Sequence, residues 1–107
     1  MAEYPQQVSS VATYLSDTIA VAVPTIADAE IDEVAVDVSG GSVWQPKVGD
    51  AVVAIPMEAL PTSAIVCGAY VSDTDEVTVS FAAKEGGTGV TGANKNFRFL
   101  YFDGTTT

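Results

Sequence analysis

Three glycines between Gly87 and Gly92 have the spacing G-x-G-x-x-G, the fingerprint of a loop that binds the pyrophosphate of a dinucleotide. Such a loop binds phosphate only where it leaves a strand and begins a helix, because the free N–H groups of the helix N-terminus hold the anion. Here the aromatic run Phe97–Phe102 follows, and it favours a strand. A P-loop does not fit either, since Ala93 and Asn94 stand where it needs Lys and Ser or Thr. We therefore interpret the segment as a loop between two strands and predict no bound cofactor.

Two groups of carboxylates offer the oxygen ligands that calcium takes. The first group is Asp28, Glu30, Asp32 and Glu33, and the second is Asp73, Asp75 and Glu76. Neither group follows the D-x-D-x-D-G loop with its distal glutamate, and calcium needs six or more converging oxygens. We therefore predict that these carboxylates are solvated on turns and strand faces and form no metal site. The alternative is a bound calcium ion.

The composition excludes whole classes of catalytic site. The chain has no histidine, which rules out Ser-His-Asp and Cys-His catalysis and histidine metal ligands. Cys67 is the only cysteine, so no disulfide forms within the chain. Two carboxylates alone can hydrolyse a glycoside, but no supporting motif accompanies them here. We predict that the protein is not an enzyme.

The charge balance narrows the range of partners. Fourteen acidic residues against four basic ones give a net charge of −10, which opposes binding to phosphate backbones and to anionic membrane surfaces. Apolar runs such as Ile19–Pro24 are far too short to span a bilayer, and the N-terminal residues have neither the basic nor the apolar region that is typical of a secretory signal. We expect no nucleic acid and no membrane as partner, and synthesis in the cytoplasm.

Three aromatic residues are candidates for contact with a partner: Tyr4, Tyr14 and Trp44. Trp44 follows a glycine turn, where a tryptophan serves either as an interface anchor or as a lid on the core. Both tyrosines lie in the polar segment 1–17, which fits either an extended arm or one short helical face. An aromatic ring on such an arm is best used if the arm packs on a neighbour.

Short strands separated by turn residues account for the rest of the chain. The segments with strand character are Thr18–Val23, Val34–Val38, Ala51–Ile55, Ala64–Val71, Val77–Ala82 and Phe97–Phe102. Ser72–Asp75 predicts a tight hairpin turn between the fourth and fifth of these. A chain of 107 residues forms one domain. We predict an N-terminal arm over residues 1–17 and, over residues 18–107, an all-β domain that is a single antiparallel β-sandwich or jelly roll.

The order of these strand and turn segments resembles that in a group of small structural proteins of tailed bacteriophages. The resemblance covers residues 18–102. The segments that carry it are Val48–Val53, Ala69–Ser72, Asp75–Phe81, a glycine-rich gap and Phe97–Phe99. The sequence departs from the commoner pattern at Lys84–Gly86, where an asparagine usually ends the strand, and in its longer N-terminal segment.

The resemblance implies a capsid decoration or cement protein, made in the cytoplasm of the host bacterium. Such a protein is often a homotrimer and binds the outer surface of the virion where major capsid subunits meet. Head-fibre and tail-fibre modules have the same order of strand and turn segments, and a carbohydrate-binding β-sandwich is a further alternative. We therefore expect the major capsid protein as partner, with Tyr4, Tyr14 and Trp44 in the contact.

Overall fold

Antiparallel strands form where apolar residues alternate with small or polar ones. The computed structural model describes residues 12–41 and 44–104, and all of its regular elements there are strands. Their bounds are β1 Thr13–Leu15, β2 Ile19–Val23, β3 Ile31–Asp37, β4 Ala51–Pro56, β5 Ala64–Asp73, β6 Glu76–Ala83 and β7 Ala93–Phe102. Over those two ranges there is no helix long and apolar enough to cross a bilayer.

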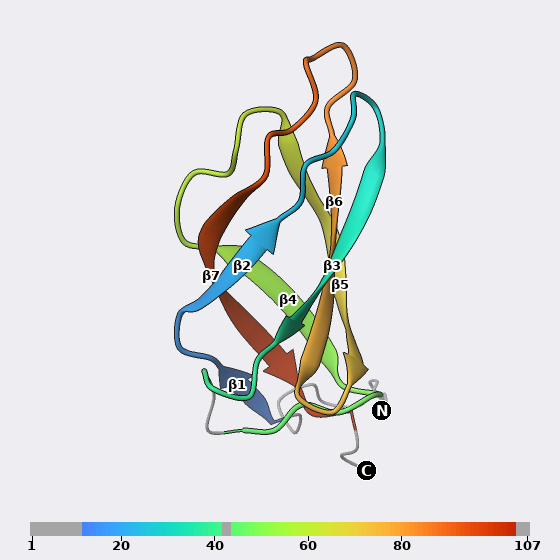
Figure 1. The fold of residues 1–107 in the computed structure, drawn as a ribbon. Helices are drawn as coiled ribbons and strands as arrows, with labels where there is room; N and C mark the ends of the chain where they lie inside the picture. The colour runs from blue at the N-terminus through green and yellow to red at the C-terminus, as the bar shows by residue number, and fades with distance from the viewer. Residues whose placement is uncertain (1–11, 42–43, 105–107) are drawn as a thin grey trace, which may run out of the picture.

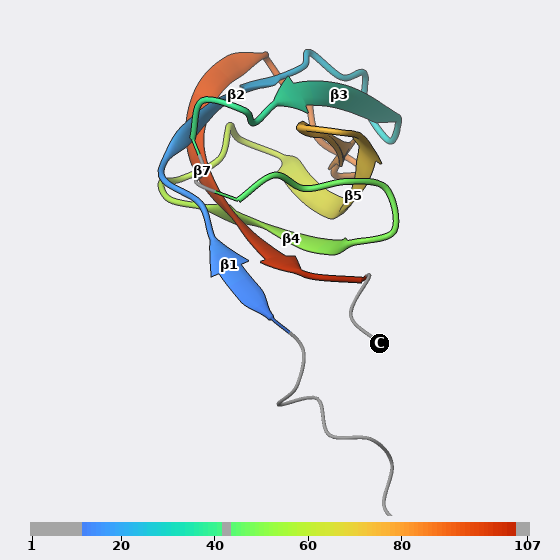
Figure 2. The same cartoon turned by 90° about the horizontal axis from the view of Figure 1, so that it is seen from below.

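The strands form two sheets that pack face to face. In the first sheet the long strand β7 pairs with β4 along one side and with β2 and then β1 along the other. In the second sheet β6 lies between β3 and β5. Seen end-on, β2, β7 and β4 lie on one side of the core and β3 and β5 on the other (Figures 1 and 2). The prediction of an all-β antiparallel sandwich is confirmed.

The two central strands supply the largest side chains of the core. Val77, Val79 and Phe81 of β6 are fully buried, as their alternation with polar residues predicts. From β7 come Phe97, Phe99 and Tyr101, also fully buried. The rings form a column through the sandwich, with centroids 6.1 Å apart from Phe81 to Phe97, 6.3 Å from Phe97 to Phe99 and 6.5 Å from Phe99 to Tyr101. This column runs toward the end of the molecule where β1 lies.

The hairpin predicted at Ser72–Asp75 joins β5 to β6 through a two-residue turn, Thr74–Asp75. Asp75 has a φ of 61°, a conformation that aspartate tolerates better than most residues. The same residue supports a neighbouring loop, because its N–H donates to Pro46 O (3.0 Å) and its carboxylate accepts from Gln45 Nε2 (3.0 Å). The turn thus fixes the loop that carries Trp44.

Part of the segment 1–17, predicted to be an N-terminal arm, is paired within the first sheet. Thr13–Leu15 is a strand, β1, paired with residues 100–102 of β7, so the sheet includes part of the expected arm and the helical alternative is wrong for Leu15. Ser16 continues the pairing although it lies outside the strand: its N–H donates to Phe99 O (2.9 Å), and its hydroxyl accepts from Phe99 N (2.9 Å). Residues 1–11, with Tyr4, lie outside the described residues.

The glycine segment leads directly into β7 without a helix, as its interpretation as a loop predicts. Packing explains the glycine spacing. Gly89 has a φ of 82°, and a Cβ there would lie 2.7 Å from Ile26 O. A Cβ on Gly92 would lie 2.8 Å from Val23 O. Between them, Val90 and Ile26 exchange two backbone hydrogen bonds of 2.7 and 3.0 Å. The glycines therefore let this loop approach the backbone that follows β2.

Candidate interaction surfaces

Two of the three predicted contact residues lie against each other at one end of the sandwich. The rings of Tyr14 and Trp44 stack with centroids 4.6 Å apart and planes 10° apart. Trp44 also packs on the buried ring of Tyr101 at 5.6 Å, and Lys47 Nζ lies 5.5 Å from the centre of the Trp44 ring. Val48, in the same loop, is exposed. We call Tyr14, Trp44, Lys47 and Val48 the aromatic end.

Trp44 combines features of both roles that its sequence context allows. It packs against the buried core, as a lid does, while both it and Tyr14 keep part of their surface exposed. Rings held in place by other rings lose little freedom when a partner covers them, which suits an anchor. The third candidate, Tyr4, lies outside the described residues.

A buried carboxylate that the sequence analysis did not single out holds the loop of the aromatic end. Asp50 accepts from Lys47 N through Oδ2 (2.9 Å) and from Gly104 N through Oδ1 (2.8 Å). Gly49, with a φ of 107°, makes the turn between them. The signal in the sequence is an aspartate three residues after the N–H that it accepts from, preceded by glycine, a pattern typical of tight turns.

The phenol beneath this end is unusual. Tyr101 is fully buried, and its hydroxyl has no hydrogen-bond partner among the described residues. Burial, and to a smaller extent the negative charge of Asp75, raises the pKa of Tyr101 to about 12. Both effects oppose the phenolate, so the neutral ring is the form that the fold accommodates.

We expect Tyr101→Phe to retain or slightly raise stability at pH 8, because it removes a buried hydroxyl without a described partner. The wild-type pKa in the folded state exceeds the ordinary value of 10.0, so the stabilising contribution of the neutral phenol is complete below pH 10 and is lost as the pH rises toward 12. Between pH 8 and pH 11.5 the wild type should lose about 2 kcal/mol more unfolding free energy than Tyr101→Phe. Urea denaturation at both pH values measures this, and equal losses would contradict it.

The outer face of the first sheet is largely apolar. Cross-strand partners lie on the same face, and one such row is Leu15, Leu100 and Val53, with Leu15 50% and Val53 47% exposed. The rows on either side of it contain Thr13, Phe102 and Ala51, and Arg98 and Ile55. Arg98 Nε donates to Ser16 O (2.8 Å), which holds the guanidinium on this face. We call the surface formed by these three rows the arginine face.

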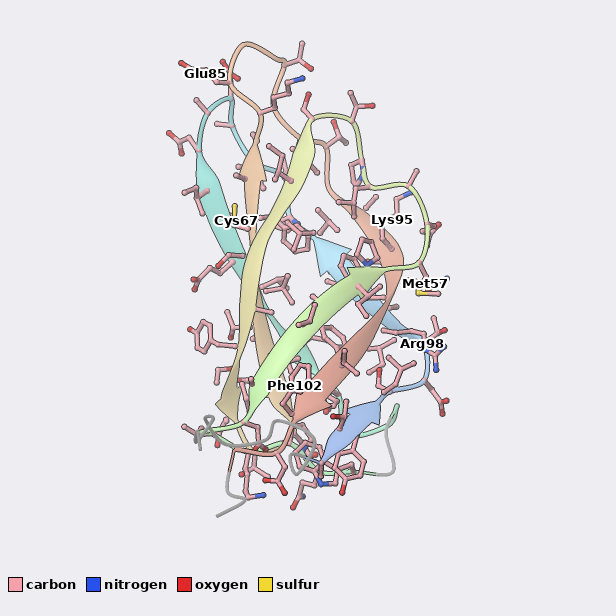
Figure 3. The ribbon with its side chains drawn as sticks, turned by 180° about the vertical axis from the view of Figure 1, so that it is seen from behind. Met57, Cys67, Glu85, Lys95, Arg98 and Phe102 are labelled. Carbon is pink, nitrogen blue, oxygen red and sulfur yellow. The ribbon has the colours of Figure 1, made fainter. Side chains whose placement is uncertain are left out.

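The outer face of the second sheet is apolar and acidic. One row is Ile31, Ala82 and Ile65, of which Ile31 is 69% and Ile65 46% exposed, and a parallel row carries Tyr70, 52% exposed. The four carboxylates of this face are Glu33, Asp37, Asp73 and Glu76. We call the outer surface of β3, β6 and β5 the acidic face. It lies on the flank of the sandwich that carries Cys67, opposite the flank of Met57 and Arg98 (Figure 3).

Three carboxylates of the two sequence groups accept hydrogen bonds from the protein itself. Asp28 accepts from Gly87 N (3.2 Å) and Glu33 from Ser80 Oγ (3.1 Å), while Glu76 accepts from Ser72 Oγ (2.8 Å). Within the part of the chain that the structure describes, no three acidic or cysteine side chains group as a metal site requires. Glu33 and Glu76 thus lie on strands, and Asp28 lies in the segment between β2 and β3.

Comparison with known proteins adds no relative. Searches against models of protein families, curated proteins and solved structures find no match to this chain. Residues 12–41 and 44–104 enclose no pocket. The surfaces that the structure defines are therefore the aromatic end and the two outer sheet faces.

Proposed function

We propose that this chain is a structural protein of a tailed-bacteriophage virion that binds the outside of the capsid where major capsid subunits meet and strengthens the shell. The observation that supports this most is the aromatic end, in which Tyr14 and Trp44 stack on each other and on the core ring of Tyr101. Partly exposed aromatic side chains that are already ordered make effective anchors for a protein partner.

The partner that we propose is the major capsid protein, because the order of the strand and turn segments resembles that of phage structural proteins. A decoration protein needs no chemistry, only a stable domain with adhesive surfaces. If the protein is a trimer, each copy presents an aromatic end to a different capsid subunit, and linkage raises the effective concentration of every contact. Weak individual contacts then give tight attachment to the shell.

A charge placed on the aromatic end tests this without disturbing the core. We expect Val48→Glu to reduce occupancy on purified particles about tenfold, because it adds an exposed carboxylate beside the aromatic anchors. The matched control is Thr88→Glu, which adds the same charge at an exposed position in the loop before β7, at the other end of the sandwich. Occupancy is read from capsids mixed with each variant, and equal occupancy of the two variants would contradict the proposed contact.

Three further results would replace the proposal. Particles that lack the protein and yet withstand heat and osmotic shock would show that it is not a cement. A labelled antibody that binds only the tail would favour the fibre alternative. A glycan array that captures the protein in a saturable way would favour the carbohydrate-binding alternative.

A further inference from the structure

We propose that copies of this chain associate head to tail, with the arginine face of one copy covering the acidic face of the next. The inference rests on the proposed function only for its expected trimer, because the contact itself is a property of the chain in solution. The partner of the acidic face is then a second copy of this chain.

Apolar side chains on both faces supply the driving force. The row of Leu15, Leu100 and Val53 on one face and the pair Ile31 and Ile65 on the other keep large aliphatic groups in water. Exposed clusters of this kind mark interaction sites, because covering them removes apolar surface from water. Each face therefore gains free energy from being covered.

Charge determines which faces pair. Of the Asp, Glu, Lys and Arg residues in the cross-strand rows, the arginine face carries only Arg98, and the acidic face carries only carboxylates. Two arginine faces would bring two guanidinium groups together, and two acidic faces would bring together the carboxylates of both copies. Only the unlike pairing puts opposite charges across the interface, and like charges across an interface cost several kcal/mol. The unlike pairing is therefore the one that both charge and apolar burial favour.

The two central charged groups are held in position by their neighbours. Arg98 is fixed by its bond to Ser16 O, which uses one of the five N–H donors of the guanidinium. Glu33 lies between the row of Ile31 and the row of Tyr70, and its carboxylate accepts from Ser80 Oγ. An ion pair between them would be surrounded by apolar side chains, where it is screened less than at an open surface.

The size of the faces bears on the assembly. Three strands about 4.8 Å apart and seven residues at about 3.4 Å each give a patch of about 14 by 24 Å, or about 340 Å² per copy, which is below the roughly 500 Å² per partner that a specific interface buries. A single contact of this size is weak. A head-to-tail contact leaves one face of each kind uncovered at the ends, and the rotation between copies decides whether a ring closes or an open chain grows. The trimer of the proposed function requires closure.

Charge reversal on each face and on both together tests the pairing. We expect Arg98→Glu and Glu33→Arg each to weaken self-association about tenfold or more in sedimentation, and the double variant to restore it, because the unlike pair is re-formed with its signs exchanged. The matched controls are Lys84→Glu and Glu85→Arg, which make the same charge changes at exposed positions of the loop before β7, off both faces. A melting curve for each variant confirms folding, and Val53→Glu gives a second probe of the arginine face should Arg98→Glu unfold.

Cys67 provides an independent readout because it is exposed on the flank of the acidic face (Figure 3). Under reducing conditions, alkylation of its thiol should slow as wild-type protein is concentrated, and Arg98→Glu should abolish that protection. Wild type that stays monomeric at every concentration would overturn the inference, as would a double variant no better than the single ones. A discrete trimer would support both the interface and the proposed function, whereas an open chain would support the interface and contradict the trimer.

Discussion

Val79→Asp is expected to leave the domain unfolded at 25 °C. Val79 is fully buried in the middle of β6, between Val34 of β3 and Ala69 of β5. A carboxylate there would face the apolar interior between the two sheets with no cation to pair with it. Burial of the charged carboxylate would cost more than the roughly 5–15 kcal/mol by which a domain is stable, and the protonated acid would still bury polar groups among apolar side chains, so unfolding is the expected result.

Val53→Asp is the matched control for this variant. Val53 is also a central residue of a strand, but its side chain lies half exposed on the arginine face, where an aspartate stays in water. Far-ultraviolet circular dichroism and a thermal melt of both variants make the comparison. A Val79→Asp protein that melts near the wild-type temperature would show that β6 presents its other face to the core, and unfolding of both variants would remove the distinction between the faces.

The alternation of apolar residues predicted the second sheet well because its cause is local. Val36 and Val38 of one segment and Val77, Val79 and Phe81 of the other are buried as the alternation predicts, although Val34 is half-buried and Thr78 is buried too. The turn residues between β5 and β6 bring adjacent segments together. A continuous apolar run was less informative. Thr18–Val23 predicts a fully buried strand, yet β2 buries Val21 and Val23 while Ala20 and Ala22 remain exposed, because alanine is small enough to face water at little cost.

The surfaces were less predictable, because they depend on pairing between distant segments. Tyr14 stacks on Trp44 only because β1 pairs with the last three residues of β7, which lie more than eighty residues away in the sequence. The arginine face likewise combines alternate residues of β1, β4 and β7, and the sequence does not show which residues of the runs 51–55 and 97–102 face the core and which face outward. Composition identified the aromatic candidates, but only strand register shows which of them share a surface.

Strand β1 also depends on pairing with a distant segment, and its removal is expected to lower the stability of the domain strongly. Deleting residues 1–16 is expected to lower the unfolding free energy by about 3–5 kcal/mol more than deleting residues 1–11, because the shorter deletion retains all of β1. The longer deletion removes the pairing with β7, the Tyr14 ring that stacks on Trp44, and the Ser16 hydroxyl that accepts from Phe99 N. A lost aromatic pair costs about 0.5–1.5 kcal/mol, and a buried N–H without an acceptor costs about 1–3 kcal/mol.

Urea denaturation of the two truncated proteins measures the difference, and Ser16→Ala in the full chain isolates the share of the hydroxyl. That variant should lose about 1–3 kcal/mol, because Phe99 N is buried and loses its acceptor. Equal stability of the two truncations would mean that β1 contributes nothing to the sheet. If the difference is as expected, only the shorter deletion separates attachment from folding. A loss of particle occupancy on deleting residues 1–11 would then assign a share of the proposed capsid contact to the segment with Tyr4.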